Sequence, residues 1–356
     1  MQITKPTLLV DKGKCMVNIQ KMVTKAKNSQ AVLRPHFKTH HSAAIADWYR
    51  SSGVEKCTVS SVSMASYFAE HGWNDITIAF PYNPLEIKKI NELARNNQLN
   101  VLIESMDSLE HAKTHLTTSI GYFLKIDVGT HRTGLDHRSE NTIAKLIEGS
   151  SEHLEFKGFL AHAGHTYGSK NRENLEYIFN GAKKILLPLR EKFGGIISFG
   201  DTPSCSIMDD LSDFDELRPG NFVFYDWMQH EIGSCQLEEI AVCLAAPVVA
   251  MHPERNEVVV YGGAVHLSKD RVGGNGETSF GKVVSLTKSG WENKVLGNVV
   301  RLSQEHGIIQ LPKEKLSQIN VGDLIGIIPV HSCLAADLQG HYLSTNGDRI
   351  DKIIKN

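Results

Sequence analysis

The sequence predicts an α/β fold in which a (β/α)8 TIM barrel is followed by a second, mostly-β domain. Between about residues 30 and 226, short β-rich runs alternate with helical patterns, as in parallel strands joined by helical crossovers. About eight such repeats in roughly 200 residues fit a closed barrel better than an open sheet. After about residue 235, apolar runs are separated by turn signals instead. We therefore expect a barrel at residues 12–234 and a β domain at 235–356, with residues 1–11 as a candidate part of the β domain.

The individual elements follow from local patterns. The eight barrel strands are expected at residues 31–37, 58–61, 76–80, 100–105, 122–127, 156–161, 196–200 and 222–225. Helices are expected at residues 85–94, 142–147 and 175–189, where apolar residues recur at intervals of three and four. The β domain is expected to contain strands at residues 240–249, 257–261, 281–287 and 324–329, and residues 7–11 are also strand-like.

Composition narrows the class of protein. The 356 residues are 41% hydrophobic and 22% charged, which excludes a mainly disordered chain. With 38 basic and 40 acidic residues, neither charge sign dominates, and we expect no nucleic-acid or membrane-surface partner. The six cysteines form no Cys-x-x-Cys pair, and the start of the chain lacks a signal-peptide pattern. We therefore expect reduced thiols and a cytoplasmic protein. Histidine is the outlier, with 17 copies.

Lys38 is the first candidate for chemistry. It ends the first predicted strand in the segment LRPHFKTH, among His36, His40 and His41. A lysine near cationic neighbours and low-dielectric walls loses proton affinity and becomes a nucleophile. A lone lysine at a strand end is more often an exposed loop residue, so its interpretation depends on the other strand ends.

Polar residues also follow the later strands, where catalytic side chains of a barrel gather. They are His131 and Arg132 after the fifth strand, His162, His165 and Tyr167 after the sixth, Gly200, Asp201, Thr202 and Ser204 after the seventh, and Arg218, Gly220 and Asn221 around the eighth. The loops after strands seven and eight are the usual phosphate site of this fold. A lysine facing a phosphate cradle suggests pyridoxal phosphate, whose aldehyde needs an amine and whose phosphate needs an anchor.

His331 and Cys333 form a second candidate cluster, after the apolar run LIGIIP. If they continue that strand, their side chains point to the same face and can converge on one ion. Imidazole plus thiolate favours zinc, and two protein ligands leave positions for water or substrate. The alternative is a buried cysteine beside a surface histidine.

These segments together resemble the fold-type III pyridoxal-phosphate enzymes, which are alanine racemase-like barrels with a C-terminal β domain. Within them, the chain looks most like the D-serine dehydratase / D-threonine aldolase family. The resemblance covers nearly the whole chain and rests on KPTLLVD, RPHFKTH, KIDVGTHRTG, HAGHTYG, GDTPS, ELRPGNFVFYD, SQEHG at 303–307 and PVHSC at 329–333. RPHFKTH and the HSC motif are the most specific of these.

The resemblance implies a role for each candidate residue. Lys38 would form the Schiff base with pyridoxal phosphate, and the further cofactor-binding residues would be Arg132, His162, Tyr167, Thr202, Gly220 and Asn221. For Arg132 the alternative is a structural salt bridge, and of His162 and His165 one is a candidate for packing against the cofactor ring. His331 and Cys333 would hold a divalent metal, zinc before manganese or magnesium, with Glu305 and His306 as weaker candidates for a surrounding shell. The family also implies a homodimer.

The implied function is a lyase that acts on a D-β-hydroxy amino acid. Cys333 favours a dehydratase for D-serine or D-threo-3-hydroxyaspartate, giving a keto acid and ammonia, because the resemblance associates a carboxylate at this position with the aldolases. The alternatives are a D-threonine aldolase, an alanine racemase-like enzyme and a non-catalytic pyridoxal-phosphate carrier. The chain departs from the family at Gln304, at the pair Met64-Ala65, and in the LAADL segment after Cys333. These departures concern the choice of substrate rather than the cofactor.

Overall fold

The computed structural model describes residues 3–273 and 278–354. Its backbone contacts divide the chain into two compact units. We call them the β unit, which comprises Met1–Ile19, Thr39–Ile45 and Asn221–Asn356, and the barrel unit, which comprises Gln20–Lys38 and Ala46–Gly220. Within the described residues, no helix has both the length and the apolar character needed to cross a membrane.

The barrel unit contains a sheet of eight parallel strands, as predicted. Their order is β2-β9-β8-β7-β6-β5-β4-β3, and an isolated parallel bridge between His36 and Thr58 joins the two ends of the sheet. The sheet is therefore a nearly closed barrel. The strands are β2 (Val32–Leu33), β3 (Lys56–Val59), β4 (Asp75–Pro81), β5 (Gln98–Ile103), β6 (Ile120–Lys125), β7 (Leu154–Ala161), β8 (Ile196–Phe199) and β9 (Glu216–Leu217).

The eighth strand was predicted in the wrong place. We expected it at residues 222–225, but the strand is β9 (Glu216–Leu217), and residues Asn221–Val223 form the 3-10 helix η4. Pro219 explains the difference, because proline has no N–H to donate and ends the ladder two residues after Leu217. Phe222 and Val223 are nevertheless fully buried. Their apolar side chains look like those of a buried strand in the sequence, but they pack into the core from a 3-10 helix.

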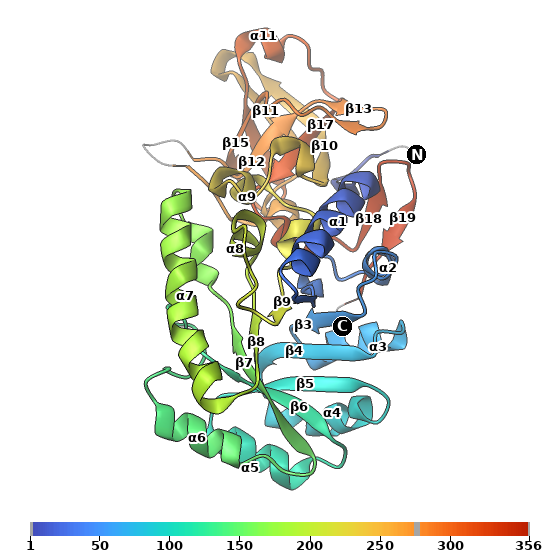
Figure 1. The fold of residues 1–356 in the computed structure, drawn as a ribbon. Coiled ribbons are helices and arrows are strands. Elements are labelled where there is room, and N and C mark those ends of the chain that lie inside the picture. The colour runs from blue at the N-terminus through green and yellow to red at the C-terminus, as the bar shows by residue number, and fades with distance from the viewer. Residues whose placement is uncertain (1–2, 274–277, 355–356) are drawn as a thin grey trace. The chain divides into compact units, whose positions relative to one another are not determined.

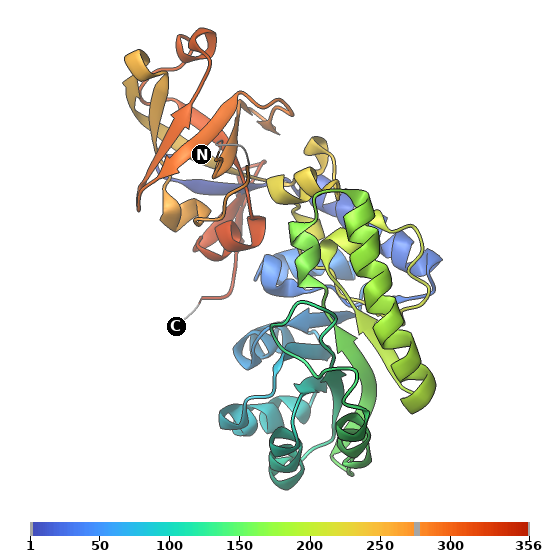
Figure 2. The same ribbon diagram turned by 90° about the vertical axis from the view of Figure 1, so that its left-hand side faces the viewer.

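Helices lie outside the barrel strands, and the long α7 runs beside β7 and β8 (Figure 1 and Figure 2). The three predicted helices are confirmed as α4, α6 and α7. Serine and asparagine side chains accept hydrogen bonds at several helix starts, for example Ser61 and Asn171. The helices are α3 (Val62–Glu70), η2 (Pro84–Glu86), α4 (Ile87–Ala94), α5 (Met106–His115), α6 (Glu140–Glu148), η3 (Gly164–Gly168), α7 (Arg172–Phe193) and α8 (Thr202–Ile207).

The β unit is built on a nine-stranded sheet whose order is β11-β16-β15-β12-β17-β10-β1-β18-β19. The strands pair antiparallel, except that β1 and β18 are parallel. Strand β1 pairs with β10, with Leu9 opposite Cys243, so the start of the chain contributes a strand to this sheet. The strands are β1 (Thr7–Val10), β10 (Val242–His252), β11 (Glu257–Tyr261), β12 (Gly281–Val284), β15 (Gly297–Leu302), β16 (His306–Gln310), β17 (Leu324–Pro329), β18 (His341–Ser344) and β19 (Arg349–Asp351).

Short helices and one hairpin complete the β unit. The hairpin joins β13 (Leu286–Thr287) to β14 (Gly290–Trp291). The helices are α9 (Trp227–Ile232), η5 (Leu237–Glu239), η6 (Pro253–Arg255), α10 (Ala264–Leu267), α11 (Lys313–Leu316) and α12 (Ser332–Asp337). Three further helices cross the sequence boundary between the units: α1 (Lys12–Asn28), η1 (Phe37–Thr39) and α2 (Ala43–Arg50).

Candidate active site

Six of the predicted site residues lie in the barrel unit, each after the C-terminal end of a parallel strand, and Gly220 is the one that follows β9. Lys38 is half-buried in η1, and Arg132 is exposed in the loop after β6. His162 follows β7 directly, Tyr167 lies in η3, and Thr202 begins α8 after β8. The rings of His162 and Tyr167 are 6.4 Å apart, and the charges of Lys38 and Arg132 both act on His162. The strand ends therefore bring Lys38, Arg132 and Tyr167 near His162.

His162 is neutral in this environment. Burial lowers the pKa of its imidazole well below the ordinary value, and the positive charge of Lys38 lowers it further. Its Nδ1 lies 2.5 Å from the carbonyl oxygen of Gly200. A carbonyl only accepts, so Nδ1 carries the hydrogen and Nε2 has the free lone pair.

Arg218 is buried and contacts residues of two barrel strands, β7 and β8. It was noted as a strand-end residue, but nothing in the sequence predicts its partners. Its Nε donates to Ser198 Oγ at 2.7 Å, and its Nη2 donates to the carbonyl oxygen of Ala161 at 2.6 Å. Burial lowers the pKa of the Arg218 guanidinium to about 10. A positive charge is thus held inside the barrel by neutral oxygen atoms.

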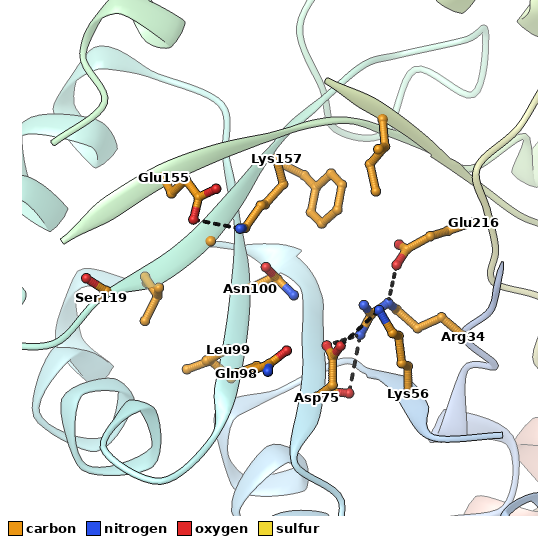
Figure 3. Close-up of a pocket in the computed structure, with 14 residues that line it drawn as sticks. Arg34, Lys56, Asp75, Gln98, Leu99, Asn100, Ser119, Glu155, Lys157 and Glu216 are labelled. Atoms are coloured by element: carbon orange, nitrogen blue, oxygen red, sulfur yellow. Dashed lines mark hydrogen bonds and ion pairs between the residues drawn. The ribbon is translucent and has the colours of Figure 1, made fainter. Parts of the chain in front are cut away.

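A series of hydrogen bonds leads from Arg218 through Ser198 and Glu216 to Arg34, at the N-terminal ends of the barrel strands. Ser198 Oγ donates to Glu216 Oε2 at 2.9 Å, and the Nε of Arg34 donates to Glu216 Oε1 at 2.8 Å. The Nη1 of Arg34 also contacts Asp75 Oδ1 at 2.6 Å. Figure 3 shows Arg34 between these two carboxylates in a cavity of about 360 Å³ at the N-terminal ends of the strands. Arg218, Glu216 and Arg34 are thus linked, through Ser198, by one series of hydrogen bonds inside the barrel.

Lys125 is a second barrel lysine and an alternative to Lys38 as the amine that would carry the cofactor. It ends β6 and is 6% exposed, and its Nζ donates to the carbonyl oxygen of Ile126 at 3.1 Å. Burial lowers the pKa of Lys125 to about 8, and the charge of Arg218 acts in the same direction. Lys125 is not among the site residues predicted from the sequence, because a single lysine inside a strand run carries no recognisable signal.

Thr202 is the predicted phosphate residue with the clearest geometry. It is fully buried, and its Oγ1 has no hydrogen-bond partner among the described residues. The preceding Asp201 caps α8, because its Oδ1 accepts the N–H of Ser204 at 2.7 Å and the hydroxyl of Thr166 at 2.9 Å. Burial raises the pKa of the Asp201 carboxyl to about 6.

Asn221 lies in the β unit, directly after Gly220, which ends the barrel unit. Its Nδ2 donates to Asp226 Oδ2 at 2.6 Å and to Ser332 Oγ at 3.1 Å, and lies 3.5 Å from Cys333 Sγ. Its Oδ1 is buried without a partner among the described residues. The amide nitrogen therefore belongs to the surroundings of the HSC motif.

The HSC motif does not continue its strand, contrary to the prediction. Strand β17 ends at Pro329, His331 is the N-cap residue of α12, and Cys333 lies in the first turn of that helix. The side chains of His331 and Cys333 interact all the same. A buried carboxylate holds the turn, because Asp226 Oδ2 accepts both the N–H of Ser332 at 2.8 Å and its hydroxyl at 3.1 Å. The turn achieves the convergence that we attributed to a strand.

In the absence of a metal, electrostatics favour a protonated His331 imidazole beside a Cys333 thiolate. Burial lowers the pKa of His331, but hydrogen bonds from its ring to Asp270 and Cys333 outweigh burial and raise that pKa to about 11. Burial raises the pKa of the Cys333 thiol, and the interaction with His331 reverses this, so the net direction is downward. A lowered pKa favours the thiolate, which is the form of cysteine that binds metal ions.

The surrounding residues differ from the weaker expectations. Glu305 Oε2 lies 4.0 Å from His266 Nε2, and His306 is exposed at the start of β16. His165 Nδ1 lies 3.2 Å from Thr130 Oγ1 in the barrel unit. The described residues contain no group of three or more histidine, cysteine, aspartate or glutamate side chains that could hold a metal ion. Among the described residues, His331 and Cys333 therefore remain the candidate ligands at this motif.

Comparisons with known proteins agree with this architecture. Residues 10–226 match the family "Alanine racemase, N-terminal domain", and residues 241–345 match the family "Putative serine dehydratase domain". The D-serine dehydratase of Dictyostelium discoideum is 30% identical, over 96% of this chain and 93% of that protein. The D-threo-3-hydroxyaspartate dehydratase of Delftia sp. (strain HT23) is 25% identical, over 92% of this chain and 90% of that protein.

A solved structure shows the same fold. It is a cysteine-to-alanine mutant of D-threo-3-hydroxyaspartate dehydratase in the metal-free form, with a TM-score of 0.89 and 22% identity. The match covers 99% of this chain and 98% of that one. The chain therefore belongs to the D-serine dehydratase family of alanine racemase-like proteins, in which the barrel and the β domain resemble those of known lyases.

Proposed function

We propose that this chain is a pyridoxal-phosphate- and divalent-metal-dependent lyase that acts on D-β-hydroxy amino acids. The favoured substrates are D-serine and D-threo-3-hydroxyaspartate, and the products are a keto acid and ammonia. The observation that carries the proposal is the pairing of the His331 imidazole with the Cys333 thiol. Racemisation needs no metal, whereas loss of a β-hydroxyl is aided by a Lewis acid.

The barrel unit has groups that fit pyridoxal phosphate. A buried phosphate needs hydrogen-bond donors, and the Thr202 hydroxyl is buried without a partner among the described residues. We assign Lys38 as the amine that carries the cofactor, with Arg132, His162, Tyr167, Gly220 and Asn221 as further cofactor-binding residues. When bound, pyridoxal phosphate would supply the electron sink that lets a proton leave the substrate Cα.

The HSC motif has groups that fit a divalent metal. A neutral imidazole nitrogen and a thiolate form a soft donor pair, which favours zinc over manganese or magnesium. Two protein ligands leave coordination positions open, as in catalytic rather than structural zinc sites. When bound, the ion would supply Lewis acidity toward the β-hydroxyl of the substrate.

The chain's own residues then have separate tasks. Lys38 Nζ accepts the proton of the substrate Cα, so its charge state controls the reaction. The neutral ring of His162 adds no positive charge beside Lys38, and its Nδ1–H keeps it bound to Gly200. His331 and Cys333 would hold the ion, and Asp226 accepts the N–H of Ser332 in the turn between them. Net loss of water from the substrate and hydrolysis of the product give the keto acid and ammonia.

We infer further that the protein acts as a homodimer in the cytoplasm. The homodimer is proposed because the family resemblance implies it. The compartment is proposed because none of the six cysteines forms a disulfide, and five of them are buried thiols.

One substrate screen tests the function. D-serine, D-threonine, D-threo-3-hydroxyaspartate and D-alanine are incubated with the purified protein, with and without exhaustive chelation, and all products are identified. We expect chelator-sensitive release of keto acid and ammonia from D-serine or D-threo-3-hydroxyaspartate. Glycine plus an aldehyde would replace this proposal with an aldolase. Chelator-insensitive racemisation of D-alanine would indicate a racemase, and bound cofactor without turnover of any substrate would indicate a carrier protein.

A labelling experiment tests the assignment of Lys38. Borohydride reduction of the yellow protein should fix the cofactor covalently to the peptide that contains Lys38. Lys125 serves as the internal comparison, because it is a buried lysine at the end of a barrel strand. Label on the Lys125 peptide would refute the assignment of Lys38.

A further inference from the structure

The His331 ring is held on one edge by a carboxylate from a distant segment. Asp270 Oδ2 lies 2.7 Å from His331 Nδ1, and the two residues are 61 positions apart in the sequence. A carboxylate oxygen accepts a hydrogen bond, so Nδ1 carries a hydrogen. In the neutral imidazole, Nε2 is then the nitrogen whose lone pair can bind a metal ion. Asp270 thus determines which ring nitrogen is available.

The segment that carries Asp270 is itself anchored in the β unit. The N–H of Asp270 donates to Ser268 Oγ at 3.2 Å. Val272 and Ser279 exchange two backbone hydrogen bonds, of 3.0 and 2.9 Å. The Asp270 carboxylate therefore approaches His331 from a segment that these hydrogen bonds hold in place.

Two carboxylates hold the HSC motif in different ways. Asp226 is 1% exposed and binds the backbone and hydroxyl of Ser332, so it maintains the turn. The Asp270 side chain is 38% exposed and contacts the His331 ring. An ion pair this exposed contributes little to folding stability. Its position on the far edge of a metal-binding imidazole suits a different task, which is to orient the ring and increase its basicity.

We propose that Asp270 is a positioning residue for the divalent metal. It holds His331 so that Nε2 faces the ion, and its negative charge strengthens the imidazole as a ligand. The inference rests on the proposed metal site at His331 and Cys333. It assigns this task to Asp270 rather than to Glu305 or His306.

Zinc affinity of the full-length, cofactor-loaded protein tests the proposal. The parent, D270N, D270A and C333A are stripped of metal and titrated with zinc in competition with a chromophoric chelator. We expect D270A to bind zinc about 10- to 100-fold more weakly than the parent. D270N should lie between them, because the amide oxygen still accepts the hydrogen bond but has no charge. The matched control is E254Q, which changes the exposed carboxylate of the Glu254–His252 pair in the β10–β11 turn and should leave zinc affinity unchanged.

Two further measurements separate positioning from a general structural role. The urea midpoint of the metal-free D270A protein should stay close to that of the metal-free parent. In an H331A background, D270A should cause no further loss of zinc affinity, because its effect passes through the imidazole. Equal losses of affinity in both backgrounds would overturn the proposal.

The possible failures are distinguishable. If C333A loses zinc but D270A binds it as the parent does, the assignment of Asp270 is wrong and the metal site stands. If the parent itself binds zinc no better than C333A does, the metal clause of the proposed function is wrong, and the inference about Asp270 falls with it.

Discussion

The hydroxyl of Thr39 lies 3.2 Å from the Sγ of Cys333, although 294 positions separate them in the sequence. Thr39 belongs to the RPHFKTH segment and directly follows Lys38. The two segments most specific to the family therefore share a side-chain contact within the β unit. Asn221 Nδ2 approaches the same sulfur at 3.5 Å. Two neutral polar groups thus approach the sulfur in addition to the His331 ring, and both can donate a hydrogen bond to a thiolate.

Removal of the metal should separate cofactor binding from turnover. Lys38 lies in the barrel unit, whereas His331 and Cys333 belong to the β unit. Exhaustive chelation, or Cys333→Ala, should keep the yellow cofactor absorbance and abolish loss of the β-hydroxyl from D-serine. Cys333→Asp should bind a harder ion such as manganese in preference to zinc. Absorbance spectra, metal content and keto-acid release are the measurements. Full activity in the metal-free protein would show that the HSC motif is structural.

Ser198→Ala should destabilise the fold strongly. The mutation removes the acceptor of Arg218 Nε and the donor to Glu216 Oε2, so each of these two buried charged groups loses one hydrogen bond. Arg218 keeps its bonds to the carbonyl oxygens of Ala161 and Ser198, and Glu216 keeps its bond to Arg34. We expect a loss of about 2–4 kcal/mol in the free energy of unfolding, measured by urea titration. The control is Ser119→Ala, which removes a single exposed hydrogen bond to the carbonyl oxygen of Glu152 and should change stability only slightly. Similar stabilities of the two variants would contradict the role given to Ser198.

Gly134→Ala tests the loop that carries Arg132. Gly134 has a φ of +113°, and a Cβ atom there would lie 2.7 Å from the backbone nitrogen of Asp127. Strain of this kind costs about 1–3 kcal/mol in the free energy of unfolding. Gly181→Ala is the matched control, because Gly181 lies inside α7 and a Cβ there meets nothing within 4 Å. That variant should be stabilised by about 0.5–1 kcal/mol. Denaturant midpoints that move in the same direction for both variants would refute this explanation.

His162 should make stability depend on pH on the acidic side of neutrality. Its pKa is lowered in the folded protein, so the folded state stays unprotonated where the unfolded chain takes up a proton. This contribution to stability is complete above the unfolded pKa, about 6.5, and is lost as the pH falls below it, by at most about 1.4 kcal/mol per pH unit. His162→Asn keeps a donor for Gly200 and removes the titration. The difference in unfolding free energy between parent and variant should shrink between about pH 6.5 and 5. A constant difference over that range would contradict a neutral His162.

Much of the fold could be predicted from the sequence because its signals are local. The alternation of strands and helices required only hydrophobic periodicity, and it identified the barrel and the helices α4, α6 and α7. The eighth strand could not be placed this way, because Phe222 and Val223 are as apolar as a strand and yet pack as a 3-10 helix after Pro219. The strand at residues 324–329 was predicted with its observed end at Pro329, but the helix that follows was not, since nothing local shows that His331 caps it and that Cys333 lies in its first turn.

The sequence by itself determined the residue types that can carry the chemistry: a strand-end lysine, a small hydroxyl residue for a phosphate, and a histidine–cysteine pair. The tertiary structure decided how they are held. Asp270 reaches His331, and Asp226 reaches Ser332 from 106 positions earlier in the chain. Ser198 likewise joins Arg218 to Glu216 across two neighbouring barrel strands. Such partners are chosen by packing between distant segments, and a single aspartate or serine has no local pattern that reveals which group it will meet.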